Sequence, residues 1–366
     1  MKRLTLILLS VFVFLPLSAQ GYEEYAKAYK ERLSNYKKQK EQALYESMEA
    51  YLAYEKAEKE KYEAYKKRVM GMWGDKEMVE STKKTWVNYS DDLTSRTNVD
   101  FENGEVKIDI LVDIDEDPKV INEKLNEAVI DLTTVKDTLT GKTILKDQFE
   151  VKKDEVLKTV TEDKTVKTVK TEEGQKKVVS VKMELDEDHL STRAAQYKDI
   201  VKRFSDKFDL DQPLVYAMIE TESAFNPKAK SHVPAYGLMQ LVPKSGGRDA
   251  YRHVHKQDII PAPVYLYVPE NNVELGAGYL NMLMTRTFAE VKDVRSRMLC
   301  AIAAYNTGAG NVSRALTGGT SVSKAVVKIN TMSYDQLFSY LKRNLPYEET
   351  RNYIQKVTER MEKYKK

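Results

Sequence analysis

The periodicity of hydrophobic positions changes twice along the chain. Between residues 20 and 72, tyrosines and leucines recur at helical spacing inside a strongly charged segment, although the apolar stripe slips between groups. Alternating apolar residues from 179 to 185 then predict a half-buried strand. From Thr192 onward the spacing is again helical, apart from an irregular stretch at 243–269 that we expect to be a surface insertion. The sequence therefore predicts a charged helical segment over 20–74, a mixed region, and a mostly helical carboxyl-terminal half.

The mixed region, residues 75–190, is expected to form a smaller α/β domain. Apolar residues from 121 to 132 recur at the spacing of an amphipathic helix. Asn103-Gly104 is a two-residue hairpin signal, and a turn at this dipeptide would place Phe101 opposite Val106.

The first 19 residues have the pattern of a secretory signal. Lys2 and Arg3 precede an apolar run from 4 to 17, and Leu17-Ser18-Ala19 is an acceptable cleavage site. The apolar run is short for a membrane span, which needs about 20 residues. We therefore expect an exported protein of the periplasm or cell envelope, either soluble or tethered by an uncleaved signal.

Composition excludes several classes of function. The 59 basic residues nearly balance the 56 acidic ones, so there is no overall signature of nucleic-acid binding. Cys300 is the single cysteine, which excludes an intramolecular disulfide and a cysteine-rich zinc site. Asp113, Asp115 and Asp117 begin like a calcium loop, but Pro118 occupies the position that requires glycine. We therefore expect neither a metal nor another cofactor.

A glutamate stands near the end of a predicted helix in the carboxyl-terminal half. Asp211-Gln212-Pro213 is a suitable helix start, because proline is tolerated in a first turn, and Asn226-Pro227 ends the helix. Glu222 therefore lies in the last turn, where the negative end of the helix dipole and burial disfavour the ionised carboxyl group. A carboxylic acid that stays protonated near neutral pH suits general acid catalysis on a glycosidic oxygen.

The region around Glu222 resembles the catalytic domain of the soluble-lytic-transglycosylase family, which is related to goose-type lysozyme. The four stretches that carry the resemblance, in the order of the family, are Ile219–Pro227, Tyr236–Leu241, Ala303–Gly310 and Leu345–Tyr353. The resemblance implies a lysozyme-like catalytic domain over 191–366. The stretch from 73 to 104 is similar to the amino-terminal domain of the membrane-bound lytic transglycosylase C family. The expected fold class is α+β, with the helical catalytic domain behind the smaller α/β domain and a charged amino-terminal helix.

The resemblance implies a role for each matching residue. Glu222 corresponds to the catalytic residue, which protonates the leaving oxygen and then takes a proton from the C6 hydroxyl of the same muramic acid. Glu220 lies about 200° away around the helix, so we expect it to be a surface or helix-end charge. The residues implied to bind substrate or to orient Glu222 are Ser223, Met239, Gln240, Tyr305, Asn306 and Tyr353.

These features predict a lytic transglycosylase that cleaves peptidoglycan glycan strands without consuming water. Two alternatives are a hydrolytic muramidase of similar fold and a non-catalytic peptidoglycan-binding scaffold of cell division. In the scaffold reading the 20–72 helix is the partner site, and contacts with cell-wall or division proteins would use it. Transglycosylase C relatives are usually anchored through a cysteine after the signal. Ala19-Gln20-Gly21 stand here instead, so we expect no lipid anchor by that route.

Overall fold

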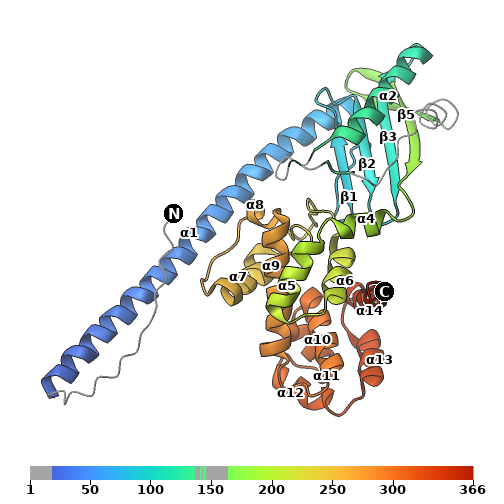
Figure 1. Cartoon of the computed structure of the whole chain (residues 1–366). Coiled ribbons are helices and arrows are strands. Elements are labelled where there is room, and N and C mark those ends of the chain that lie inside the picture. Colours follow the sequence, from blue (N-terminus) through green and yellow to red (C-terminus); the bar gives the residue numbers. More distant parts are fainter. Residues whose placement is uncertain (1–18, 137–140, 142, 146–163, 366) are drawn as a thin grey trace. The chain divides into compact units, whose positions relative to one another are not determined.

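The computed structural model describes residues 19–136, 141, 143–145 and 164–365 and has an α+β architecture (Figure 1). The chain divides into two compact units, residues 1–46 and 47–366. The predicted secretory signal lies outside the described residues except for Ala19. Across the described ranges, no helix is both long enough and apolar enough to cross a membrane.

The elements of the amino-terminal half include one long helix and a sheet. In chain order they are α1 (Ala19–Trp73), β1 (Thr85–Tyr89), β2 (Ser95–Asp100), β3 (Glu105–Asp113), α2 (Pro118–Thr134), β4 (Thr165–Thr171) and β5 (Gly174–Glu184). The carboxyl-terminal half is helical. Its elements are α4 (His189–Ala195), α5 (Lys198–Phe208), α6 (Gln212–Ser223), η1 (Pro243–Gly247), α7 (Arg248–His255), α8 (Pro263–Leu266), α9 (Pro269–Met282), η2 (Leu283–Thr287), α10 (Val294–Thr307), α11 (Ala309–Thr317), α12 (Val322–Ile329), α13 (Tyr334–Asn344) and α14 (Glu348–Lys363).

Helix α1 is continuous through residue 73, although its apolar stripe slips. Its last turns belong to the second unit, where Val69 and Trp73 are fully buried and the Trp73 indole donates to the Leu93 carbonyl at 2.7 Å. Gly74 ends the helix with a φ of 92°, a left-handed conformation that glycine adopts without strain. A side chain there would also meet the Lys170 carbonyl oxygen at 2.5 Å.

The sheet is antiparallel with the strand order β1-β2-β3-β5-β4, and both faces are covered. Helix α2 lies across one face, where Ile108, Val181 and Leu125 share a core (Figure 1). The opposite face packs on the end of α1 through Leu111 and Val178. Alternating residues of β3 and β5 therefore enter two separate cores, which confirms the predicted strand at 179–185 and the predicted helix at 121–132.

The predicted hairpin register was wrong. Strands β2 and β3 are joined by a four-residue turn, and Val99 rather than Phe101 stands opposite Val106. The Asp100 carboxylate accepts hydrogen bonds from the backbone N–H groups of Glu102 and the following residue, at 2.9 and 3.0 Å. This side-chain cap stabilises the longer turn and releases Phe101 from the ladder into the core, where it is fully buried.

A buried ion pair crosses the centre of the sheet. Arg96 of β2 and Asp109 of β3 are nearly inaccessible to solvent, and their side chains meet at 2.7 Å. The Asp109 carboxylate also accepts from the Ser180 hydroxyl, while the Arg96 guanidinium lies 4.5 Å from the centre of the Trp73 ring. Burial alone would raise the pKa of Asp109, but the Ser180 hydrogen bond and the Arg96 charge outweigh it and hold that pKa below its ordinary value.

The carboxyl-terminal half packs around helix α6, which contacts α14, α5 and α4. Met218 and Ile219 of α6 are fully buried in one core together with Ala303 and Ile354. The prediction of an irregular insertion at 243–269 was wrong, because this stretch contains η1, α7 and α8. Its helices have only five, eight and four residues, so their apolar spacing is too brief to give a helical signal.

The two halves meet at the residues that follow α6. Arg193 of α4 donates to the carbonyl oxygens of Ala224 and Phe225 at 3.0 and 2.8 Å. Its guanidinium lies 3.7 Å from the centre of the Phe101 ring. Ala224 itself packs into the core between the sheet and α2. The end of α6 is therefore held by groups from both halves.

We expect Asp109→Ala to lower the free energy of unfolding by about 3–5 kcal/mol, because Arg96 would remain buried without a carboxylate. Urea denaturation followed by tryptophan fluorescence measures this, since buried Trp73 lies against Arg96. Asp113→Ala is the matched control. It removes an exposed partner of Lys176 and should leave the unfolding midpoint almost unchanged, because solvent screens a surface ion pair. Similar unfolding midpoints for both variants would contradict this account.

Candidate active site

Glu222 lies in the last turn of α6, and its side chain is buried. The helix ends abruptly because Ala224 and Phe225 both adopt left-handed backbone conformations, with φ values of 48° and 60°. Such conformations cost roughly 1–2 kcal/mol per residue when the residue is not glycine. The two hydrogen bonds from Arg193 to their carbonyl oxygens stabilise this strained turn.

The carboxyl group of Glu222 has one hydrogen-bond donor in close contact. The Tyr353 hydroxyl of α14 donates to Glu222 Oε1 at 2.6 Å. Burial raises the pKa of Glu222 to about 7, and the Tyr353 hydrogen bond and the charge of Lys83 oppose part of that rise. Near neutral pH the carboxyl group is therefore present in both its protonated and its ionised forms.

The resemblance implied that Tyr353 would approach the catalytic carboxyl, and it is found there. Burial and the charge of Glu222 raise the pKa of the Tyr353 hydroxyl well above its ordinary value, so the hydroxyl stays a donor. Its oxygen also lies 3.3 Å from the sulfur of Met218. Tyr353 is not among the residues lining the cavity onto which Glu222 opens, so it contacts the carboxyl group from the protein side.

Two of the other predicted substrate contacts do not face this cavity. Ser223 is fully buried, and its hydroxyl donates to the Leu238 carbonyl at 2.8 Å. Met239 is equally buried, and its side chain packs directly against Gly276 of α9. Both side chains therefore hold the loop at 236–241 instead of lining the cavity.

That loop is also fixed by a residue that sequence reasoning missed. Asn272 of α9 is fully buried, and its amide accepts from the Met239 N–H at 2.7 Å. It donates to the carbonyl oxygens of Tyr236 and Leu266, both at 2.8 Å. Gly237 has a φ of 75°, and a side chain there would collide with the Leu266 carbonyl and with Asn272. An asparagine within a predicted helix carries no sequence signal for this role.

Gln240, Tyr305 and Asn306 line the same cavity as Glu222. The Gln240 amide donates to the carbonyl oxygens of Gly237 and Ala229, at 2.9 and 3.1 Å. Its Oε1 atom is buried and has no hydrogen-bond partner among the described residues. Gln240 therefore borders the cavity while its amide group is turned into the protein and fixes the loop.

The two residues of the third motif are held by their neighbours. The Tyr305 hydroxyl donates to the Met239 carbonyl at 2.9 Å, and Asn306 Oδ1 accepts from the Thr350 hydroxyl at 2.7 Å. The hydroxyl that donates to Glu222 is that of Tyr353, whereas the Tyr305 hydroxyl positions the loop at 236–241. Asn306 lines the cavity, and the Thr350 hydroxyl fixes the orientation of its amide group.

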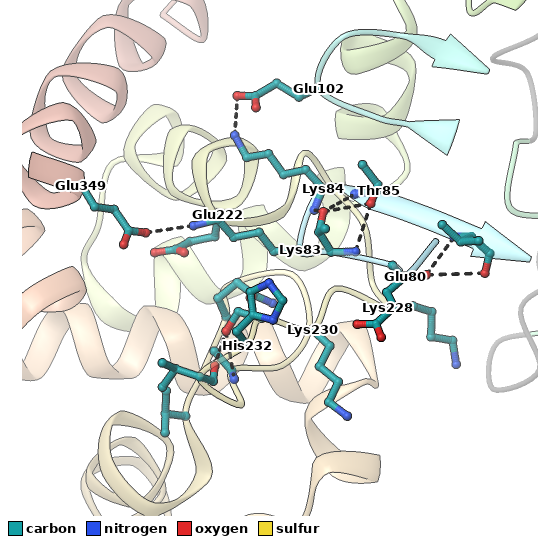
Figure 2. A pocket seen from close by; sticks show the side chains of 18 of the residues that line it. Glu80, Lys83, Lys84, Thr85, Glu102, Glu222, Lys228, Lys230, His232 and Glu349 are labelled. Carbon is teal, nitrogen blue, oxygen red and sulfur yellow. Dashed lines mark hydrogen bonds and ion pairs between the residues drawn. The ribbon is translucent and has the colours of Figure 1, made fainter. Parts of the chain in front are cut away.

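The cavity has a volume of about 1240 Å³ and is lined by both halves of the chain. Figure 2 shows Lys83, from the segment before β1, beside Glu222 and paired with Glu349 of α14 at 3.1 Å. The neighbouring Lys84 pairs with Glu102, which also binds Arg360 at 2.9 Å. Sequence reasoning placed no residue of the amino-terminal half in the site, and the Lys83-Lys84 pair gave no distinguishing signal.

Glu220 lies in the last turn of α6, as one of the two predicted roles required, but the alternative that it is a surface charge was wrong. Its carboxylate is buried and pairs with Arg360 and Lys363 of α14, at 3.0 Å in each case. It also accepts a hydrogen bond from the Tyr364 hydroxyl. The prediction that it points away from Glu222 is consistent with these partners. Arg360 and Lys363 reach Glu220 because α14 packs on α6, and the residues next to Glu220 in the sequence do not predict this pairing.

The metal candidates of the sequence have other contacts. Asp117 caps α2, accepting from the Lys119 N–H at 2.7 Å. Within the described part of the chain, no group of three histidine, cysteine or acidic side chains gathers as a metal site would require.

Comparison with protein families finds two matching domains. Residues 39–170 match the family described as the membrane-bound lytic murein transglycosylase C, N-terminal domain. Residues 199–327 match the transglycosylase SLT domain. Solved structures of similar sequence include lytic transglycosylase Slt from Pseudomonas aeruginosa, with 28% identity over 46% of this chain, and the 70 kDa soluble lytic transglycosylase from Escherichia coli, with 26% identity over 46%. Both have a TM-score of 0.35, and the match spans 24% of each of those chains.

Curated relatives match over most of the sequence. Membrane-bound lytic murein transglycosylase C from Klebsiella pneumoniae subsp. pneumoniae is 29% identical over 319 residues, which is 81% of this chain and 86% of the relative. The protein of the same name from Salmonella arizonae is also 29% identical, with the same coverage. The chain therefore carries a transglycosylase SLT domain that follows an amino-terminal domain of the membrane-bound lytic murein transglycosylase C type, and its curated relatives are lytic murein transglycosylases.

Proposed function

We propose that this chain cleaves the β-1,4 bond between N-acetylmuramic acid and N-acetylglucosamine in peptidoglycan and leaves a 1,6-anhydromuramic acid end. The observation that carries the proposal is the buried carboxyl group of Glu222, whose pKa is about 7 and which faces a large cavity. The names of the relatives and the match to the SLT domain support peptidoglycan as the substrate.

In the first step, protonated Glu222 gives its proton to the glycosidic oxygen as the bond from that oxygen to C1 of muramic acid breaks. The Tyr353 hydroxyl, 2.6 Å from Oε1, stabilises the carboxylate that forms. In the second step, the C6 oxygen of the same sugar bonds to C1, and its proton returns to Glu222. One group thus serves as acid and then as base, and no water is consumed.

The state of the other carboxylates supports this route over hydrolysis. A hydrolytic glycosidase ordinarily needs a second free carboxylate to activate water or attack the sugar. Among the described residues, every other acidic side chain lining the cavity has partners. Glu349 pairs with Lys83, Glu102 with Lys84, and Glu80 accepts from a tyrosine hydroxyl. Asp100 accepts from the backbone N–H groups of its own turn.

The remaining site residues bind or support the substrate in this proposal. Gln240 borders the cavity, and its amide holds the loop that forms this part of the wall on which a sugar would rest. The Asn306 amide nitrogen donates to a sugar oxygen, because its own oxygen is engaged by Thr350. Ser223 and Met239 act through the loop that carries Gln240.

We propose the cell envelope as the place of action, since the relatives are named membrane-bound and the predicted signal would export the chain. No cysteine follows that signal, so a lipid anchor by that route is not part of the proposal. We also propose domain limits at 74/75, between the helical segment and the α/β domain, and at 190/191, between the α/β domain and the catalytic domain. Protein partners from the cell wall or division machinery remain assigned to the helical segment at 20–72.

The proposed function predicts which sugar end is left on the fragments that the protein releases. Muropeptides released from purified peptidoglycan should end mainly in 1,6-anhydromuramic acid, which mass spectrometry distinguishes from a reducing end by the missing water. Glu349 is the group that would act as a hydrolytic base, because its charge reaches Glu222. If reducing ends dominate in the wild type and disappear in Glu349→Gln, the protein is a muramidase.

We expect Glu222→Gln to lower turnover by at least about 100-fold, because the amide has no transferable proton. Its thermal stability at neutral pH should not fall, since a buried neutral group replaces a partly ionised one. Glu220→Gln is the matched control two residues away and should show the opposite pattern. It leaves Arg360 and Lys363 less well paired, so stability drops while the folded enzyme keeps its turnover. Equal losses of turnover in both variants would refute the assignment.

The raised pKa of Glu222 also predicts a pH dependence of stability. The folded carboxyl group holds its proton up to about pH 7, whereas the ordinary value is 4.5. The folded state therefore binds more protons in this window, and about 3 kcal/mol of stability present at low pH is lost as pH rises through it. Urea denaturation of wild type and Glu222→Gln at about pH 4 and about pH 8 should show this loss in the wild type alone. If the free energy of unfolding changes with pH in the same way in the wild type and in Glu222→Gln, the raised pKa of Glu222 is contradicted.

A further inference from the structure

One side of the cavity is aromatic and comes from helix α1, which the chemistry proposed above does not use. Tyr62 and Tyr65 both line the cavity that contains Glu222. Their side chains are 38% and 36% exposed, whereas Tyr51 of the same helix is only 2% exposed. Tyr51 is thus a packing residue, while Tyr62 and Tyr65 present ring surface to the cavity.

Both rings are held in place by their neighbours. The Tyr62 hydroxyl donates to the Glu80 carboxylate. The Tyr65 ring meets the Tyr89 ring edge to face, with centroids 6.2 Å apart. Tyr89 in turn packs against Trp73 at 5.8 Å, and its hydroxyl accepts from the Val79 N–H at 3.0 Å. Stacking of a ligand on Tyr62 and Tyr65 would therefore cost little side-chain entropy, because both rings are already held in place.

The surroundings of the two rings favour a sugar over a charged peptide. One face of a pyranose ring carries C–H groups that pack on an aromatic ring, while its hydroxyls need polar partners at the edge. Glu80, Ser81 and Thr82 line the cavity with these tyrosines and supply such partners. Lysines line the cavity as well, but Lys83 and Lys84 are paired with Glu349 and Glu102, whereas Glu80 stands directly beside Tyr62 and disfavours the carboxylates of peptide stems.

The volume of the cavity also exceeds what bond cleavage requires. Cleavage involves the two sugars that flank the bond, yet about 1240 Å³ is more than the roughly 300–1,000 Å³ of a typical small-ligand pocket. Part of the lining of this cavity comes from α1 and from the segment that precedes β1.

We propose that Tyr62 and Tyr65 form a carbohydrate subsite that binds sugar units of the glycan strand beyond the two units on each side of the cleaved bond. This inference rests on the proposed function, because it takes the same strand as the substrate. Its consequence is a preference for long strands over short fragments.

The test compares long glycan strands with the tetrasaccharide made of two disaccharide repeats, using the full chain. In Tyr62→Ala/Tyr65→Ala, KM for long strands should rise at least about tenfold, because stacking on two aromatic rings is lost, while kcat stays unchanged. Turnover of the tetrasaccharide should not change. Tyr62→Phe keeps the ring and should retain most of the affinity. Tyr36→Ala, which removes an exposed tyrosine of the first compact unit, is the control and should behave as wild type.

Binding to purified sacculi by Glu222→Gln, with and without the two alanines, tests the subsite separately from catalysis. Weaker binding with both alanines supports the subsite even if wild type cleaves nothing, in which case only the proposed function fails. Unchanged binding and unchanged KM would overturn the inference. Equal losses on long strands and tetrasaccharide, or losses confined to strands that carry peptide stems, would overturn it as well.

Discussion

The hydrogen bond from Tyr353 to Glu222 is the contact around which this site is organised. A carboxyl group buried without a partner would be costly, and a fully paired one would lose its proton and its use as an acid. A single neutral donor satisfies one oxygen yet leaves the pKa near 7. This balance requires α14 to lie against the last turn of α6, and the packing of α6 on α14 is correspondingly extensive.

Control of charge around that carboxyl group explains much of the rest. Cations from several elements neutralise the surrounding acids, so Glu220 is paired with Arg360 and Lys363 while Glu349 is paired with Lys83. Glu222 alone among these acids is left with a neutral partner. Because Lys83 belongs to the amino-terminal half, that half contributes to the electrostatics of the site as well as to the shape of the cavity.

Local sequence patterns predicted the elements well and their partners poorly. The end of α6 could be placed from Asn226-Pro227, because a residue before proline avoids the helical conformation. The hairpin register could not be predicted from Asn103-Gly104, since the cap supplied by Asp100 favours a longer turn. Ser223 and Met239 matched a motif, yet both side chains lie in the protein interior.

The sequence by itself determined the fold class, the position of Glu222 in the last turn of a helix, and the motif residues that gather near it. These follow from periodicity, proline positions and short motifs, all of which act over a few residues. Only the tertiary structure decided that Glu220 is neutralised, that Asn272 fixes the loop of Gln240, and that Tyr62 borders the cavity. Those contacts join residues far apart in the chain, and a pairing between distant helices leaves no periodic trace in either one.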